Sequence, residues 1–282
     1  MTTARYPLTD EDIQRYEQDG VVCLRGVFDA DRVAKLGDEM ERVLANPGPQ
    51  GKDYDIKGPG RFRYDTFMWT RHEPFWRVQV DSVLPQLTAD LMRSTRSYLM
   101  ADILFVKEPG TPSPTPWHQD QPYGWYDGSQ VCSVWIPLDR VTLESGALEY
   151  VAGSHHWNRW FRPVGFETGS HQATQRFEPM PDIESDRAHH RIVHFDMEPG
   201  DALFHHLLML HGAPGNSTSG QRRRAVAYRY AGDDARYAVR EVGPKPIWDP
   251  GLSHGDPFGC ELFPQVWPPH AVPRFWERRS SS

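Results

Sequence analysis

The chain has 282 residues, of which 38% are hydrophobic and 12% aromatic, and its formal net charge at pH 7 is −7. This negative charge excludes an extended phosphate-binding surface, so we expect no nucleic acid among its partners. No apolar run reaches the length of a membrane-spanning helix, and residues 1–10 lack the apolar centre of a secretion signal. Three widely spaced cysteines suggest no disulfide framework. Together these features favour a cytoplasmic protein that does not bind membranes.

The first part of the chain, to about residue 95, predicts helices. Thr9 followed by Asp12 is typical of a helix N-cap with an acidic residue three positions later, and Gly20 fits the end of that helix. Asp29 begins a second helix with apolar residues at helical spacing, and Ser82 begins a third. We expect these helices to pack on one face of a sheet.

Residues 47–65 interrupt this helical region. They are rich in glycine, proline and charge, so we expect a loop. Three aromatic residues lie in this segment: Tyr54, Phe62 and Tyr64. They could face a cavity, but we favour the simpler interpretation that they pin the loop to the rest of the protein.

From about residue 98 the pattern changes to β-strands. The clearest segments are residues 103–107, 131–138, 147–151, 201–204 and 225–230. The side chains of the second segment alternate, which places Ser133 and Trp135 on the same face. Several short strands separated by turns predict a mainly β protein with flanking helices and a jelly-roll core. We expect one domain over residues 1–282, with helices at about 8–95 and the core at about 98–231.

Two long segments stand apart from these strands. Residues 156–192 resemble an insertion, and long loops in compact domains are often lids over a site. Their aromatic residues are Trp157, Trp160, Phe161 and Phe166. We expect them to close over a substrate pocket, and the alternative is that they only fasten the loop to the barrel. Residues 233–282 are too rich in aromatics for a disordered tail, so we expect them to wrap against the barrel or enter a subunit contact.

The sequence Trp117-His118-Gln119-Asp120 carries a candidate metal site. On a β-strand, His118 and Asp120 would point to the same face because the side-chain period is two. A third ligand from a distant strand, His211, would complete one face of an octahedral metal and leave three positions open. Two histidines and one carboxylate are the ligand set of non-haem Fe(II) oxygenases. His205 and His206 compete with His211 for the third position.

Several further segments accompany these residues. They are Leu8-Thr9, Gly20-Val21-Val22, Lys107-Glu108-Pro109-Gly110, Trp135-Ile136-Pro137-Leu138-Asp139, Glu144-Ser145-Gly146-Ala147-Leu148, Gly153-Ser154-His155, Gly200-Asp201 and Leu210-His211-Gly212. In this combination, from about residue 8 to 231, the chain resembles the phytanoyl-CoA dioxygenase family of Fe(II)- and 2-oxoglutarate-dependent oxygenases. The resemblance implies a double-stranded β-helix (jelly-roll) core and Fe(II) on His118, Asp120 and His211. It also implies 2-oxoglutarate as co-substrate and O₂ as oxidant.

The resemblance further implies an arginine that binds the distal carboxylate of 2-oxoglutarate. In the family this arginine follows the distal histidine by eleven residues, which makes it Arg222 here and supports His211 as the ligand. A planar guanidinium matches a carboxylate with two hydrogen bonds. Arg224 has the same strand parity as Arg222 and is the alternative, whereas Arg223 should point away.

Other residues near these motifs have two interpretations each. Trp135 lines the 2-oxoglutarate pocket or belongs to the core. Lys107 is structural, with a contact to the co-substrate as the alternative. Ser154 and His155 reach substrate or only fix a turn. The aromatic residues after the metal motif, which line the substrate pocket or pack the barrel mouth, are Tyr123, Trp125 and Tyr126.

These observations predict an oxygenase that hydroxylates or otherwise oxidises a free, small, largely apolar organic molecule, in secondary metabolism, with release of succinate and CO₂. An acyl-CoA or carrier-bound acyl hydroxylase is the alternative enzyme. A non-catalytic jelly-roll protein that binds a small molecule is the alternative from another class. The presence of Asp120 argues against a halogenase, because that variant replaces the carboxylate with a small residue.

Overall fold

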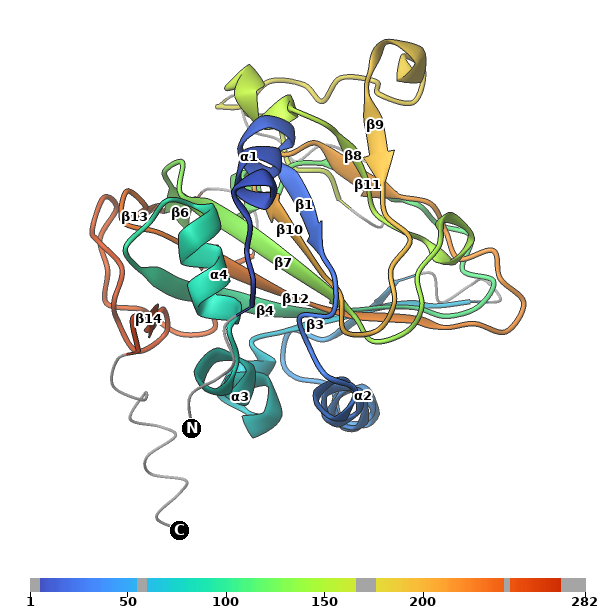
Figure 1. Ribbon diagram of the computed structural model, residues 1–282, viewed down its shortest axis with the longest axis horizontal. Helices are drawn as coiled ribbons and strands as arrows, with labels where there is room; N and C mark the ends of the chain where they lie inside the picture. Colours follow the sequence, from blue (N-terminus) through green and yellow to red (C-terminus); the bar gives the residue numbers. More distant parts are fainter. Residues whose placement is uncertain (1–5, 55–59, 166–175, 241–243, 270–282) are drawn as a thin grey trace.

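The computed structural model describes residues 6–54, 60–165, 176–240 and 244–269, and two antiparallel β-sheets form its centre (Figure 1). The large sheet contains β1 (Val21–Leu24), β2 (Lys52–Tyr54), β3 (Phe62–Thr66), β4 (Ser97–Lys107), β7 (Val131–Pro137), β10 (Ala202–His206), β12 (Arg223–Ala231) and β14 (Gln265–Trp267). The small sheet contains β5 (Thr115–His118), β8 (Glu149–Val151), β9 (Ile192–His194) and β11 (His211–Ala213). A two-stranded sheet pairs β6 (Tyr126–Asp127) with β13 (Arg236–Tyr237).

The order of the strands is that of two opposed sheets joined by crossovers. The large sheet runs β1-β10-β7-β12-β4-β3-β2, with β14 also paired to β4, and the small sheet runs β5-β11-β8-β9. Strands distant in sequence are neighbours in both sheets, because the chain crosses between them several times from β4 to β12. The mainly β jelly-roll predicted from the sequence is confirmed.

In the described ranges, four α-helices and five short 3₁₀ segments accompany the sheets. The α-helices are α1 (Asp10–Asp19), α2 (Ala30–Ala45), α3 (Glu73–Asp81) and α4 (Leu84–Leu91). The 3₁₀ segments are η1 (Met68–Thr70), η2 (Gln121–Tyr123), η3 (Leu143–Ser145), η4 (Ser154–Trp157) and η5 (Arg187–His189). The predicted caps of the first helix are present, since Thr9 and Asp12 cap each other reciprocally and Gly20 ends the helix at φ 76°. Asp29 caps α2, whereas the third predicted helix begins at Leu84, two residues after Ser82.

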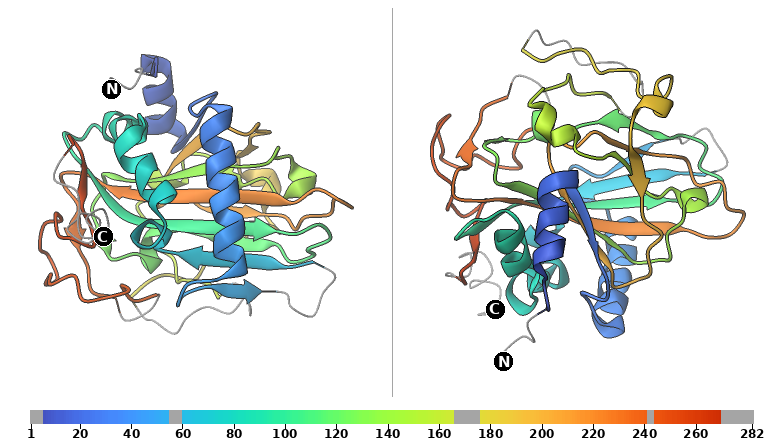
Figure 2. Two further views of the ribbon diagram at one scale, coloured as in Figure 1. Left: turned by 90° about the horizontal axis from the view of Figure 1, so that it is seen from below. Right: turned by 45° about the horizontal axis from the view of Figure 1, so that its top comes forward.

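The two faces of β12 show how the large sheet is buried. α2 and α3 lie on one side of this sheet and the small sheet lies on the other (Figures 1 and 2). On the helical side, the hydroxyls of Tyr228 and Tyr230 donate hydrogen bonds to the Phe75 carbonyl and the Gln79 side chain of α3. On the opposite side, the small Ala227 lies between Ile103 of β4 and Trp135 of β7. The side that faces the small sheet is therefore the one with room for a cavity.

The predicted loop over residues 47–65 is wrong for residues 52–54 and 62–65, which form strands. β2 and β3 pair there and extend the large sheet beyond β4, with Lys52 opposite Tyr64 and Tyr54 opposite Phe62. The glycines and prolines that suggested a loop lie outside these two strands in the sequence, at residues 47–51 and 58–60. Aromatic side chains in cross-strand pairs stabilise such strands, and this pairing is not visible in local composition.

The predicted insertion over residues 156–192 is fastened to the small sheet. Phe161 is buried in a small cluster with Val151 and Leu210, and Trp157 packs against that cluster. The indole N–H of Trp117 also donates to Glu184 across the insertion. Phe166 lies outside the described residues. The contacts of Trp157 and Phe161 favour the alternative interpretation, in which the aromatics attach the loop to the barrel.

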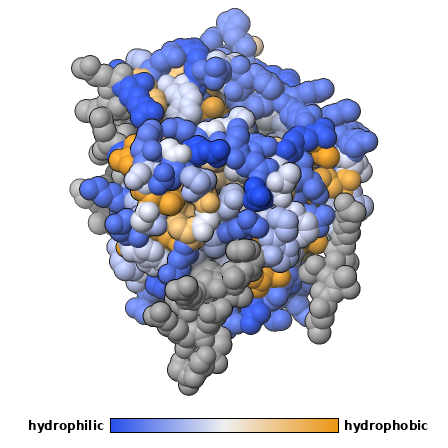
Figure 3. Space-filling model, turned by 90° about the vertical axis from the view of Figure 1, so that its left-hand side faces the viewer, coloured by the Kyte–Doolittle hydropathy of each residue, from blue (hydrophilic) through white to orange (hydrophobic). Residues whose placement is uncertain are grey.

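The described part of the C-terminal segment packs against the large sheet. Phe258, Phe263 and Val266 belong to the main hydrophobic core, and β14 pairs with β4. On the face shown in Figure 3, apolar side chains form small groups between polar ones. Within the described ranges, no helix has the length and apolarity that crossing a bilayer requires.

Candidate metal centre

His118 and His211 meet across a strand pair of the small sheet. His118 is the last residue of β5, His211 is the first residue of β11, and the two are directly opposite in the antiparallel register. Their ring centroids are 4.1 Å apart. Together with Asp120 they offer ligand atoms that all lie within 4.8 Å of one another, and all three residues are buried.

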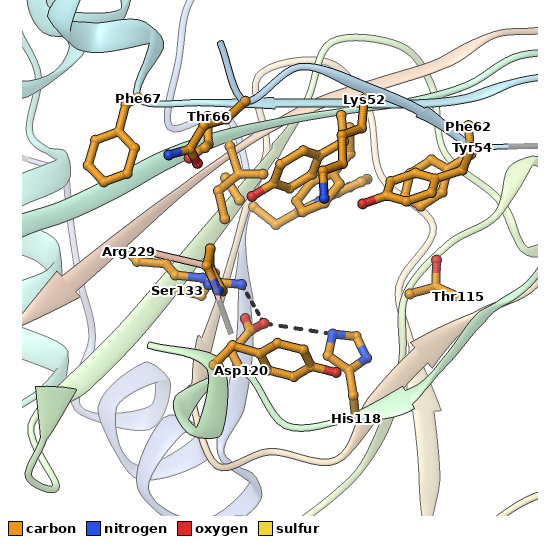
Figure 4. A pocket seen from close by; sticks show the side chains of 18 of the residues that line it. Lys52, Tyr54, Phe62, Thr66, Phe67, Thr115, His118, Asp120, Ser133 and Arg229 are labelled. Carbon is orange, nitrogen blue, oxygen red and sulfur yellow. Dashed lines mark hydrogen bonds and ion pairs between the residues drawn. The ribbon is translucent and has the colours of Figure 1, made fainter. Parts of the chain in front are cut away.

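Asp120 reaches this site by a different route from the one predicted. β5 ends at His118, and Asp120 has helical backbone angles at the start of η2. Its N–H donates to the Leu207 carbonyl at 2.9 Å, which fixes the turn. Gln119 points away from the site, donating to the Leu208 carbonyl and accepting the Phe161 N–H. The turn after β5, rather than strand alternation, therefore brings the carboxylate beside the imidazoles (Figure 4).

Both imidazoles are held in the form that a metal needs. Nδ1 of His118 lies 2.7 Å from the Pro116 carbonyl, and Nδ1 of His211 lies 3.0 Å from the Met209 carbonyl. A carbonyl only accepts, so each Nδ1 carries the proton and each Nε2 presents a lone pair. The Nε2 atoms lie 3.7 and 4.0 Å from the Asp120 carboxylate. Burial lowers the pKa of His118 and lowers the pKa of His211 to about 4, which keeps both rings neutral at pH 7.

The carboxylate of Asp120 is held from two further directions. Arg229 of β12 forms an ion pair with Oδ1, and Nε2 of His205 lies 3.4 Å from Oδ2. Burial alone would raise the pKa of Asp120, but the Arg229 guanidinium and the His205 hydrogen bond outweigh it and hold that pKa well below its usual range. Arg229 was not among the residues predicted from the sequence. The pattern that could have indicated it is its position six residues after Arg223, on the same face of a strand.

The two competing histidines have other hydrogen-bond roles. A carboxylate only accepts, so His205 carries its proton on Nε2, and the Tyr150 hydroxyl donates to its Nδ1 at 3.1 Å. His205 thus donates to Asp120 rather than offering a lone pair. His206 uses Nε2 to donate to the Ser129 carbonyl and Nδ1 to accept the Leu208 N–H. The geometry favours His211 as the third ligand.

A cavity of about 910 Å³ opens beside these residues. One wall carries the three candidate ligands, and the opposite wall carries aromatic residues of β2, β3 and β4 (Figure 4). These aromatic residues are Tyr54, Phe62, Tyr64 and Phe105. The first three were expected to pin a loop, and that interpretation is wrong. Tyr123 also lines the cavity, whereas Trp125 and Tyr126 are buried outside its lining.

The structure corrects the prediction for the arginine. Arg222 lies outside the cavity lining, with its guanidinium on Glu108 and Glu41 at 2.9 and 2.8 Å. Arg224 also points outward, to Asp139 at 2.7 Å. The residue that enters the cavity is Arg223, because β12 begins there and places it on the face shared with Ala227 and Arg229.

Arg223 is a buried cation that forms no ion pair with a described carboxylate. Its exposed fraction is 2%, and its Nε has no hydrogen-bond partner in the described part of the chain. Burial lowers its pKa to about 10, so it remains charged at pH 7. Its guanidinium lies 5.5 Å from the centre of the Trp135 ring. A buried guanidinium of this kind fits an anionic ligand such as a carboxylate.

Trp135 and Lys107 differ in their relation to the cavity. Trp135 lines it beside Arg223, as the alternation of residues 131–138 predicts. Lys107 is fully buried and lies outside the cavity lining. Its ammonium donates to the Pro214 carbonyl at 2.6 Å and lies 5.5 Å from the Phe62 ring. These contacts favour the structural interpretation of Lys107 over its alternative, a contact with the co-substrate.

The segment Gly153-Ser154-His155 contacts the backbone next to His211, outside the cavity. The Ser154 hydroxyl accepts the N–H of Leu210, the residue before His211, at 2.9 Å. The ring of His155 lies against the Glu17 carbonyl, outside the cavity. Of the two interpretations of this segment, the structure favours the one in which it fixes the local backbone.

The residues present fit both a metal ion and 2-oxoglutarate. Two neutral imidazoles and one ionised carboxylate converge, which is the donor set of non-haem iron sites with open positions. The unpartnered Nε of Arg223 in the same cavity fits the far end of a dicarboxylate. The arrangement can hold a divalent metal next to an anionic co-substrate and a larger apolar molecule.

Comparisons with known proteins agree with this geometry. The family model for phytanoyl-CoA dioxygenase (PhyH) matches residues 16–225. A probable phytanoyl-CoA dioxygenase of Caenorhabditis elegans is 30% identical over 151 residues, which are 51% of this chain and 46% of that protein. The peroxisomal phytanoyl-CoA dioxygenase of Homo sapiens is 25% identical over 248 residues, 82% of this chain and 70% of the human protein. The crystal structure of the non-haem α-ketoglutarate-dependent carbocyclase SnoK superposes on this chain with a TM-score of 0.74 at 23% sequence identity. The match covers 92% of this chain and 97% of the SnoK chain, and it confirms the fold.

Proposed function

Because this chain belongs to the phytanoyl-CoA dioxygenase family and is an Fe(II)- and 2-oxoglutarate-dependent dioxygenase, we propose that His118, Asp120 and His211 hold the iron and that Arg223 binds 2-oxoglutarate. The observation that carries this assignment is the buried guanidinium of Arg223, whose Nε has no hydrogen-bond partner among the described residues, in the cavity of the three candidate ligands. Burial of such a charge is costly without an anion, so a dicarboxylate is its natural partner.

The chain's own residues prepare the site in distinct ways. Fe(II) bound here would supply oxidation by O₂, coupled to conversion of 2-oxoglutarate to succinate and CO₂. His118 and His211 present Nε2 lone pairs because backbone carbonyls hold their Nδ1 protons. Arg229 and His205 orient the Asp120 carboxylate. Trp135 covers the Arg223 guanidinium, which limits water at the carboxylate it would bind.

The proposed substrate is a free small molecule with a sizeable apolar skeleton, and the proposed reaction is its hydroxylation or a related oxidation. Support comes from the volume of the cavity, about 910 Å³, and from its aromatic wall. SnoK, which has a similar fold, is described as a carbocyclase from nogalamycin biosynthesis, which supports a place in secondary metabolism. The human relative is named for a CoA thioester, so an acyl thioester is the competing substrate class.

The proposed compartment is the cytoplasm, and the proposed partners are small molecules without nucleic acid. The free thiols of Cys23, Cys132 and Cys260 support a reducing compartment. The net charge of −7 disfavours a polyanionic partner.

Succinate release tests the proposed function. Purified protein incubated with 2-oxoglutarate in air should release succinate when Fe(II) is added and should stop when a chelator removes it. A library of small organic molecules, screened by mass spectrometry for a gain of one oxygen atom or a loss of two hydrogens, should identify compounds that accelerate this release. Metal-independent formation of succinate would contradict the proposal.

A further inference from the structure

The wall opposite the metal centre carries a lysine among aromatic rings. Lys52 and Tyr54 share one face of β2, and both line the cavity. Figure 4 shows the Lys52 side chain reaching from this wall into the cavity, on the side opposite His118 and Asp120. A lysine at this position faces whatever molecule occupies the space between the two walls.

The charge of Lys52 is not neutralised by its acidic neighbours. Asp53 points to the other face of β2, where it forms ion pairs with Arg63 and Arg61 at 2.9 and 3.5 Å. Among the described residues, no carboxylate pairs with Lys52. The ammonium therefore remains available to a ligand in the cavity.

A second lysine adds positive charge to the lining of the cavity. Lys245, in the described segment 244–269, also lines the cavity and forms no ion pair with a described carboxylate. Its carbonyl accepts a hydrogen bond from the side chain of Gln50, two residues before Lys52. Asp120 is the only acidic side chain among the described lining residues, and Arg229 already holds it. The cavity is thus cationic in a protein whose net charge is −7.

An apolar surface connects these lysines with the rest of the cavity. The rings of Tyr54 and Phe62 lie 5.4 Å apart, those of Phe62 and Phe105 lie 6.2 Å apart, and those of Phe105 and Tyr64 lie 5.8 Å apart. Such a row of rings across three neighbouring strands favours a flat or elongated apolar body that stacks along it.

We propose that the substrate is a free organic acid, whose ionised group meets Lys52 and Lys245 while its aromatic or polycyclic body lies along the ring surface toward the metal centre. This inference rests on the proposed function and narrows its substrate class. It differs from the apolar molecule expected from sequence, because net charge does not reveal a local cluster of lysines.

A matched pair of fluorescent probes tests this inference. 1-Pyrenebutyrate and its neutral amide share a polycyclic body and differ in charge. Their binding to protein loaded with Mn(II) and 2-oxoglutarate is measured by fluorescence anisotropy, without turnover. We expect the wild-type protein to bind the acid about tenfold more tightly than the amide. Lys52→Met and Lys245→Met should each reduce this ratio, and Lys35→Met, on the exposed side of α2, should preserve it.

Three outcomes would overturn the inference. Equal binding of acid and amide by the wild-type protein would show that the lysines do not select charge. A loss of 2-oxoglutarate affinity in Lys52→Met, with probe selectivity intact, would assign Lys52 to the co-substrate. Displacement of the acid by free coenzyme A at micromolar concentration would assign the lysines to the phosphates of a thioester carrier. Iron-dependent succinate release in the same preparation keeps these outcomes separate from failure of the proposed function.

Discussion

His211 lies directly opposite His118 across the β5–β11 pair, so two candidate ligands 93 residues apart in sequence share one point of the small sheet. Antiparallel pairing fixes this relationship, because residues in register present their side chains on the same face. Asp120 enters from the turn that follows β5. The site is therefore built on hydrogen-bonded backbone, and its geometry should survive removal of any single ligand.

The first prediction follows from this arrangement. His118→Ala, Asp120→Ala and His211→Ala should each abolish iron-dependent succinate release and lower the bound iron measured by anaerobic dialysis and elemental analysis. Their circular dichroism spectra should remain like that of the wild-type protein. His205→Gln serves as the control and should retain iron, because His205 donates to Asp120 instead of offering a lone pair. Iron retained in His211→Ala but lost in His205→Gln would reverse the assignment.

The second prediction concerns the ion pair between Arg229 and Asp120. The Arg229 side chain is only 15% exposed in the wild-type protein. Arg229→Met therefore leaves the buried Asp120 carboxylate without its cation. Breaking a buried pair in this way costs about 3–5 kcal/mol. Urea unfolding of the metal-free protein should show a loss of this size. Arg140→Met breaks the exposed pair with Glu198 and should cost at most about 1 kcal/mol. Similar losses in both variants would show that the Arg229 pair adds no stability.

The third prediction concerns Asp102, a fully buried residue of β4. Burial raises its pKa to about 8, although the Trp69 N–H donates to its carboxylate and acts in the opposite direction. Between about pH 4 and pH 8 the unfolded chain therefore releases a proton that the folded chain keeps. The free energy of unfolding should fall with rising pH in this window, by up to about 1.4 kcal/mol per pH unit.

Asp102→Asn tests this pH dependence, because the amide keeps an acceptor for Trp69 but does not titrate. Urea unfolding should show the variant to be more stable than the wild-type protein at pH 8.5, with the difference shrinking toward pH 4.5. A difference that is constant with pH would mean that Asp102 titrates alike in the folded and unfolded states.

The convergence of the three candidate metal ligands could be predicted from sequence, partly for the wrong reason. The motif around His118 and the Leu210-His211-Gly212 segment identified all three residues that converge in the structure. Strand alternation was invoked for Asp120, but its position depends on a turn held by the carbonyl of Leu207. Residue types and their order are local information, whereas the backbone path that joins them depends on contacts with a distant loop.

The arginine shows the limit of counting residues. The spacing selected Arg222, whereas the arginine that faces the cavity is set by the turn before β12, where the Asn216 side chain donates to the carbonyls of Lys107 and Gln221. The alternation of small and large residues in β12 was an available signal. Ala225 and Ala227 mark the open face that Arg223 shares, whereas the large tyrosines mark the face under the helices.

The aromatic wall of the cavity could not be predicted from the local sequence. Tyr54, Phe62 and Tyr64 become cavity residues only because β2 and β3 pair with each other and with β4, which follows them by more than thirty residues. Their composition resembled a loop, and the stabilising contact is long-range. The same pairing places Lys52 in the cavity.

The affinity of Arg223 variants for 2-oxoglutarate tests the central claim most directly. Titration of 2-oxoglutarate into anaerobic protein loaded with Fe(II) gives the dissociation constant for wild-type protein, Arg223→Met and Arg222→Met. Removing one partner of a buried charge pair costs about 2–5 kcal/mol, which corresponds to a loss of roughly 30-fold or more. We predict this loss in Arg223→Met and a change of less than about threefold in Arg222→Met, since surface pairs contribute little. A larger loss in Arg222→Met, or unchanged affinity in Arg223→Met, would contradict the account.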